Sequence, residues 1–135
     1  MNDRGRPKLV RRIDGTQLIA NLAEVLEEII SRGAVYLVHM AEDRGAGDAT
    51  PDPANPARPI GFAFGPPQVL GRVFALIDEM EYGWPRDVQV SEVTGLPDLI
   101  PRWHRHSLLW RDGTPVAMSI NAAEYQQLQE HWDSS

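Results

Sequence analysis

The sequence predicts an α+β domain in which two longer helices and a C-terminal helix pack on a small, mostly antiparallel sheet. Two patterns lead to this class. Apolar residues recur at helical spacing over 15–32, 67–83 and 122–132, and strand-like patterns cover 34–40, 60–64, 87–93 and 107–120. Because 135 residues is the size of one domain, these helices and strands are expected to share one core.

A first helix is predicted over Gly15–Arg32, followed by a strand over Ala34–Met40. Asp14 and Gln17 have the spacing of a capping box, and Gly33 stands where glycine commonly ends a helix. The helix carries one apolar stripe, made of Leu18, Leu22, Val25, Leu26 and Ile29.

Residues 42–59 are predicted to form a mobile loop within the domain. Glycines and prolines interrupt this stretch, and no apolar stripe runs through it (Gly45, Gly47, Pro51, Pro53, Pro56 and Pro59). Long loops are uncommon in small domains, so this one is either functional or a seam between two units.

A second helix is predicted after a short strand formed by Ile60, Phe62 and Phe64. Pro66 and Pro67 can open the helix, and its apolar stripe runs through Leu70, Val73, Phe74, Ile77 and Met80 to Gly83. A strand over 87–93 follows. The repeated order of helix then strand, over 15–40 and 67–93, hints at an internal duplication, although the identity between the two passages is slight.

The clearest pattern is a β-hairpin that leads into a capped helix. Ser107–Arg111 is predicted as a strand, and Asp112-Gly113 is typical of a two-residue hairpin turn. The return strand alternates through Val116, Met118 and Ile120. Asn121 is the expected helix cap, with Glu124 closing a capping box.

Charge is distributed unevenly along the chain. Residues 1–12 carry five basic side chains and one acidic, whereas the rest carries eight basic and eighteen acidic, for a net charge of −6. This contrast predicts a basic, flexible arm over 1–12 attached to an acidic folded domain over 13–135. An arm of this kind indicates an anionic partner, and the alternative is a solvated tail that keeps the protein soluble.

The arm contains a candidate DNA-binding motif, Arg4-Gly5-Arg6-Pro7-Lys8, which resembles the core of an AT-hook. Glycine lets the backbone follow the narrow minor groove of A·T-rich DNA, and the arginines extend into its negative potential. Arg11 and Arg12 are candidates for phosphate contacts. The motif is short, so an ordinary basic tail is the alternative interpretation.

The segment Asp112–Tyr125 resembles the hairpin and helix of the Phd/YefM family of antitoxins. The matching residues are Gly113, Pro115, Val116, Ala117, Glu124, Tyr125 and Leu128. An earlier helix-to-strand passage of the same family is similar to Asn21–Val38, which contains Leu22, Val25, Leu26 and Gly33, and Val73–Gly83 is the alternative counterpart.

The resemblance implies a dimer that binds operator DNA and a C-terminal tail that wraps a toxin. Some 60 to 70 residues separate the two matching segments here, where the family has almost none. The chain given ends at Ser135, soon after the last helix. We therefore expect DNA binding and dimerisation more than toxin neutralisation, with a cognate toxin as a further candidate partner.

No catalytic residue, cofactor or metal site is expected. Cysteine is absent, which excludes disulfides and thiolate ligands, and no phosphate-binding loop or nucleophile elbow is present. His104 and His106 lie near each other, but no nearby carboxylate completes a ligand set, so both are expected in a solvated loop or at a phosphate. No apolar run is long enough to span a membrane, and a cytoplasmic location is expected.

The sequence therefore favours a dimeric, DNA-binding transcriptional regulator of the antitoxin type. The alternative is an acidic protein-binding module, such as an immunity-type or phage-type inhibitor, that does not bind DNA. The dimer or partner interface is expected on the C-terminal helix, at Tyr125, Leu128 and Trp132, or on the first helix.

Overall fold

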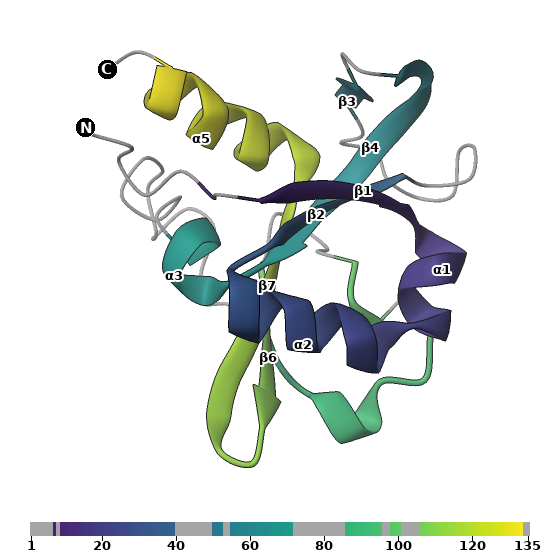
Figure 1. Ribbon diagram of the computed structural model, residues 1–135, viewed down its shortest axis with the longest axis vertical. Helices are drawn as coiled ribbons and strands as arrows, with labels where there is room; N and C mark the ends of the chain where they lie inside the picture. Colours follow the sequence, from purple (N-terminus) through teal and green to yellow (C-terminus); the bar gives the residue numbers. More distant parts are fainter. Residues whose placement is uncertain are drawn as a thin grey trace.

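A mixed seven-stranded sheet forms the centre of the computed structural model, which describes residues 7, 9–39, 50–52, 55–71, 86–95, 98–100 and 106–133 (Figure 1). The strand order is β1-β2-β4-β7-β6-β5, and β3 pairs with β4 outside this path. The β1–β2 and β5–β6 pairs are parallel, whereas the other four pairs are antiparallel. The strands are β1 (Val10–Asp14), β2 (Val35–His39), β3 (Thr50–Asp52), β4 (Asn55–Gly65), β5 (Arg86–Gln89), β6 (Ser107–Arg111) and β7 (Thr114–Asn121).

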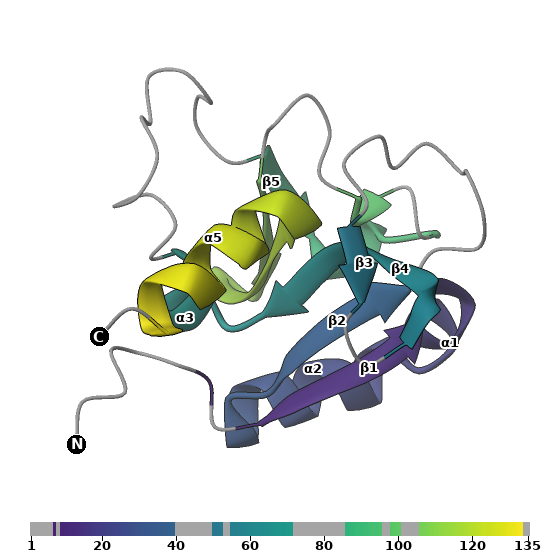
Figure 2. The same ribbon diagram turned by 90° about the horizontal axis from the view of Figure 1, so that it is seen from above.

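Helices cover both faces of this sheet. Helices α1 (Gly15–Ala20) and α2 (Leu22–Arg32) contribute to one buried cluster with Tyr36 and Phe62, whereas α3 (Pro67–Leu70) and α5 (Ala122–Asp133) contribute to a second. In Figure 2, α2 lies below strands β1 and β2, and α5 lies above them. The α+β class is therefore confirmed, with a mixed sheet. Among the described residues, no helix is long and apolar enough to cross a membrane.

The sheet consists of two halves with the same internal order. In the first, β1 pairs in parallel with β2, which pairs antiparallel with β4; in the second, β5 pairs in parallel with β6, which pairs antiparallel with β7. Strands β4 and β7 join the halves at the centre. Helices α3 and α5 follow these two strands and cover the same face. The repeat thus begins with a strand rather than with a helix, so the boundaries predicted from the sequence were misplaced.

The first predicted helix is two helices, because the chain leaves helical geometry at Asn21. This residue has φ −120° and ψ 28°, and its side-chain amide donates a 3.1 Å hydrogen bond to the Gln17 carbonyl. Asparagine competes in this way with the backbone ladder. Asp14 precedes α1 without a side-chain capping bond, so the predicted capping box is wrong. Gly33 ends α2 in the left-handed region, at φ 66°, as expected.

The predicted loop over 42–59 is wrong in its second half. Residues 50–52 form β3 and β4 begins at Asn55, while 40–49, 53 and 54 lie outside the described residues. Proline lacks an N–H and is tolerated where a strand has few ladder bonds to make. Pro56 and Pro59 lie in the part of β4 that precedes its pairing with β2 and faces the short strand β3.

The second predicted helix is described only at its start. Pro67 occupies the first turn of α3, as expected, and the remainder of that helix, from 72 to 83, lies outside the described residues. The strand predicted over 87–93 is shorter: β5 ends at Gln89, and Val90–Glu92 forms a single 3₁₀ turn.

The hairpin and capped helix at the C-terminal end are confirmed. Asp112 and Gly113 both have positive φ, at 53° and 78°, which is the geometry of the favoured two-residue turn. The Asn121 side chain accepts a 2.9 Å hydrogen bond from the Glu124 N–H and so caps α5. The Glu124 carboxylate does not complete a capping box as predicted; it lies 2.8 Å from His106 Nε2.

Candidate nucleic-acid interface

The basic N-terminal residues lead directly into strand β1. Arg4, Gly5, Arg6 and Lys8 lie outside the described residues, whereas Pro7, Arg11 and Arg12 lie within them. Residues 10–12 belong to the strand, so the predicted flexible arm extends too far at its C-terminal end. The motif Arg4–Lys8 therefore ends within two residues of the folded sheet.

Strand β1 is held to the sheet by its parallel pairing with β2. The Val35 N–H donates a 2.9 Å hydrogen bond to the Leu9 carbonyl, and the two strands then pair from Val10 to Asp14. Leu9 and Ile13 pack against the core beneath α2. Since side chains alternate along a strand, Arg11 lies on that same side, and Val10 and Arg12 lie on the other.

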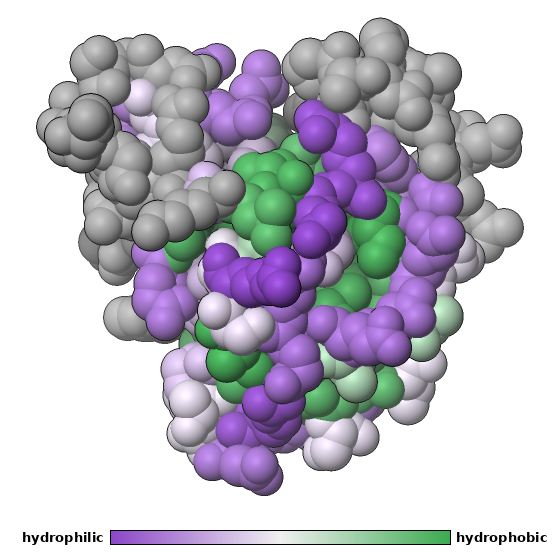
Figure 3. Space-filling model, viewed as in Figure 1, coloured by the Kyte–Doolittle hydropathy of each residue, from purple (hydrophilic) through white to green (hydrophobic). Residues whose placement is uncertain are grey.

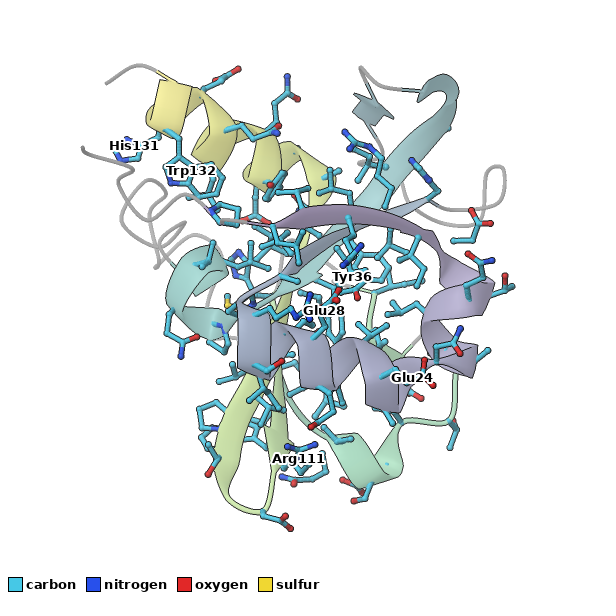
Figure 4. All side chains as sticks on the ribbon, viewed as in Figure 1. Glu24, Glu28, Tyr36, Arg111, His131 and Trp132 are labelled. Carbon is cyan, nitrogen blue, oxygen red and sulfur yellow. The ribbon has the colours of Figure 1, made fainter. Side chains whose placement is uncertain are left out.

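Arg11 is part of a hydrogen-bonded cluster that links β1, α2 and β2. Its Nε and the Tyr36 hydroxyl both donate to the same oxygen of Glu28, Oε1. Figure 4 shows Glu28 and Tyr36 pointing toward one another between the helix and the sheet. The Arg11 side chain is 45% exposed and that of Glu28 is 19% exposed, so solvent reaches the arginine more than its partner.

This cluster fixes the charges of its three members at neutral pH. The hydrogen bond from Tyr36, followed by that from Arg11, lowers the pKa of Glu28. Glu28 in turn raises the pKa of Arg11 through a hydrogen bond. Burial, together with the bond to Glu28, raises the pKa of Tyr36 to about 12. The site thus contains an ionised carboxylate, a guanidinium and a neutral phenol.

The surface around β1 is mixed in charge rather than uniformly basic. Glu24 and Glu27 are exposed on α2, and Glu27 lies 3.6 Å from Arg111 on the hairpin. In Figure 3, which shows this side of the molecule, hydrophilic side chains run over β1 and α2 with hydrophobic surface between them. The described residues of this face therefore do not form a strongly basic surface.

Tyr36 should make the stability of the protein depend on pH above about 10. Its pKa is about 12 in the folded chain and about 10 when exposed, so the stabilisation is complete below 10 and is lost as the pH rises to about 12. The loss should be on the order of 2–3 kcal/mol. Urea unfolding across this range should show it, and Tyr36→Phe should remove this component of the pH dependence.

The predicted interface residues of the C-terminal helix are not available to a partner. Tyr125, Leu128 and Trp132 are 3%, 0% and 4% exposed and fill the core between α5 and the sheet. The rings of Tyr125 and Trp132 meet edge to face, with centroids 5.9 Å apart. The interface predicted at these side chains therefore has almost no exposed surface in the single chain, because their apolar face packs on the sheet.

A buried contact between a histidine and a glutamate also went unpredicted. The side chains of His106 and Glu124 are 0% and 4% exposed, and their nearest atoms are 2.8 Å apart. His106 was expected in a solvated loop or at a phosphate, and this expectation is wrong. His104 lies outside the described residues. Within the described part of the chain, no three His, Asp or Glu side chains are grouped to hold a metal ion.

No protein family model, no curated protein and no solved structure matches this chain.

Proposed function

We propose that the protein is a DNA-binding transcriptional regulator of the antitoxin type, in which the N-terminal basic residues contact an A·T-rich operator. The observation that supports this most is the position of β1. The five residues Arg4–Lys8, which resemble an AT-hook core, are followed within two residues by a strand in parallel register with β2. Attachment to a rigid support reduces the ordering entropy that a free peptide would lose on binding.

The charge distribution determines which end of the protein attracts DNA. The chain after residue 12 carries ten more acidic than basic side chains, so DNA is repelled from the body and attracted to the N-terminal end. Two copies of a weak motif in one dimer would strengthen binding without further contacts. Because the apolar face of α5 is buried, the outer face of α2, where Ile30 is 47% exposed, is the better candidate for the dimer contact.

The C-terminal hairpin and helix support the antitoxin part of the proposal. Pro115, Glu124 and Tyr125 carry the resemblance to Phd/YefM antitoxins, and the last two are buried between α5 and the sheet. In this proposal the C-terminal hairpin and helix stabilise the fold. The resemblance to the family also implies a cytoplasmic location and a cognate toxin.

The double variant Arg4→Ala/Arg6→Ala should bind a labelled A·T-rich duplex more weakly, because each arginine contributes a groove contact. We expect a loss on the order of 1 kcal/mol or more per arginine, with a shallower dependence of affinity on salt between about 50 and 200 mM. Fluorescence anisotropy at the two salt concentrations measures both effects.

Arg111→Ala is the control for the loss of a positive charge outside the N-terminal residues. Arg111 is 42% exposed at the end of β6, where it lies near the hairpin turn (Figure 4). Its removal should leave duplex affinity close to that of the wild type. Equal losses in the two variants, or no duplex binding by the wild type at low salt, would contradict the proposal.

The second candidate function is an acidic protein-binding module that does not bind DNA. The exposed carboxylates Glu24 and Glu27 on α2 favour it, since a basic partner would be attracted to them. Charge reversal of these two residues should then abolish capture of that partner, and the wild type should not bind the duplex at low salt.

A further inference from the structure

Arg11 follows the proposed DNA-binding residues Arg4–Lys8 and is held by a carboxylate of its own chain. It follows Lys8 by three residues, and three residues of extended chain span about 10 Å. That length corresponds to about three base pairs along the helix axis, so a duplex bound by Arg4–Lys8 would bring phosphates within reach of Arg11. In the structure, however, Arg11 Nε donates to Glu28 Oε1.

We propose that Glu28 competes with DNA phosphate for Arg11, so that this arginine is withheld in the free protein and exchanges onto the backbone when DNA binds. This inference rests on the proposed function. It assigns α2, which contains Glu28, a role in setting the affinity of the N-terminal contact.

The cluster is built so that Arg11 can leave at low cost. Glu28 Oε1 accepts a second hydrogen bond, from the Tyr36 hydroxyl, and Tyr36 is 7% exposed and fixed in the core. When Arg11 moves away, the carboxylate oxygen still has this donor, which avoids the penalty of an unsatisfied buried acceptor. The Arg11 side chain is 45% exposed, so its path into solvent is open.

Because Glu28 is negatively charged, it competes with DNA phosphate for Arg11 rather than orienting Arg11 toward the phosphate. Hydrogen bonds from Tyr36 and Arg11 lower the pKa of Glu28, so the carboxylate is ionised at neutral pH. A phosphate that approached Arg11 without displacing Glu28 would meet this negative charge beside the guanidinium. A neutral amide at the same position would remove the repulsion and would hold Arg11 only through a weaker hydrogen bond to an uncharged acceptor, so the arginine is released more easily.

The test compares Glu28→Gln with Glu24→Gln for binding of the same A·T-rich duplex. Both substitutions remove one negative charge from α2, but only Glu28 contacts Arg11, and Glu24 is exposed one turn earlier. We expect Glu28→Gln to bind about twofold to fivefold more tightly than Glu24→Gln at low salt, which is the size of an exposed charge pair. Its affinity should also fall more steeply with salt, because in the wild type salt weakens the competing bond to Glu28 as well as the phosphate contact.

Adding Arg11→Ala to Glu28→Gln should abolish the gain, because the released arginine causes it. Thermal unfolding of each variant identifies any loss of the fold before binding is measured. Equal affinity of the two glutamine variants, or weaker binding by Glu28→Gln, overturns the competition while leaving the function in place if Arg4 and Arg6 still matter. Failure of the wild type and of every variant to bind at low salt overturns both.

Discussion

Replacing Glu124 by alanine should lower the free energy of unfolding by about 2–5 kcal/mol, because it removes a buried side chain together with its contact to a buried imidazole. Glu124 Oε2 lies 2.8 Å from His106 Nε2, and neither side chain is more than 4% exposed. The substitution removes the carboxylate that this fully buried imidazole contacts, and it also leaves a cavity under the first turn of α5. Equilibrium unfolding in urea measures the change.

Glu130→Ala is the matched control, because Glu130 is exposed on the same helix. It should change stability by no more than about 0.5 kcal/mol. The double variant His106→Ala/Glu124→Ala should cost less than the sum of the two single variants, because the second substitution removes a contact that is already broken. If Glu124→Ala were no more destabilising than Glu130→Ala, the pair would not support α5.

The C-terminal third of the fold could be predicted from the sequence because its signals are local. Asp112-Gly113 specifies the turn, Asn121 caps the helix, and Met118 and Ile120 alternate onto the face that α5 covers. Each of these features depends on residues close together in the chain. The break at Asn21 is also local, but the apolar stripe of Gly15–Arg32 continues through it and hides it.

The strands β1 and β3 could not be predicted, because their partners lie far away. β1 contains two arginines between Val10 and Ile13, so its local sequence resembles a charged tail. Only its pairing with β2 identifies it as a strand. β3 contains Pro51, which local reasoning assigns to a loop. In both cases tertiary pairing overrides a weak local preference.

The candidate site was predicted only in part for the same reason. The Arg4–Lys8 motif is visible in the sequence, whereas the bond between Arg11 and Glu28 spans 17 residues and requires α2 to pack over β1. The contact of His106 with Glu124 likewise joins the start of β6 to α5. One signal was present: Glu124 follows its cap by three residues, where a carboxylate points back toward the preceding turn.

Leu128→Ala should lower the free energy of unfolding by about 2–5 kcal/mol, and the loss should not depend on protein concentration. Leu128 is completely buried between α5 and the sheet, together with Leu37 and Ile120. Truncating it removes core contacts and leaves a cavity that the surrounding strands fill only in part. An interface residue behaves differently, because its contribution to stability grows with the concentration of the partner subunit.

Unfolding of the wild type and of Leu128→Ala over a hundredfold range of concentration distinguishes a core role from an interface role. Gln127→Ala is the control, since Gln127 is exposed on the neighbouring position of α5 and should cost no more than about 0.5 kcal/mol. A core role gives a constant difference between Leu128→Ala and wild type at every concentration. A difference that widened with concentration, because only the wild type gained stability, would return Leu128 to a subunit interface. Such a widening difference would also mean that α5 leaves the sheet when two chains meet, because Leu128 has no exposed surface while α5 is packed on the sheet.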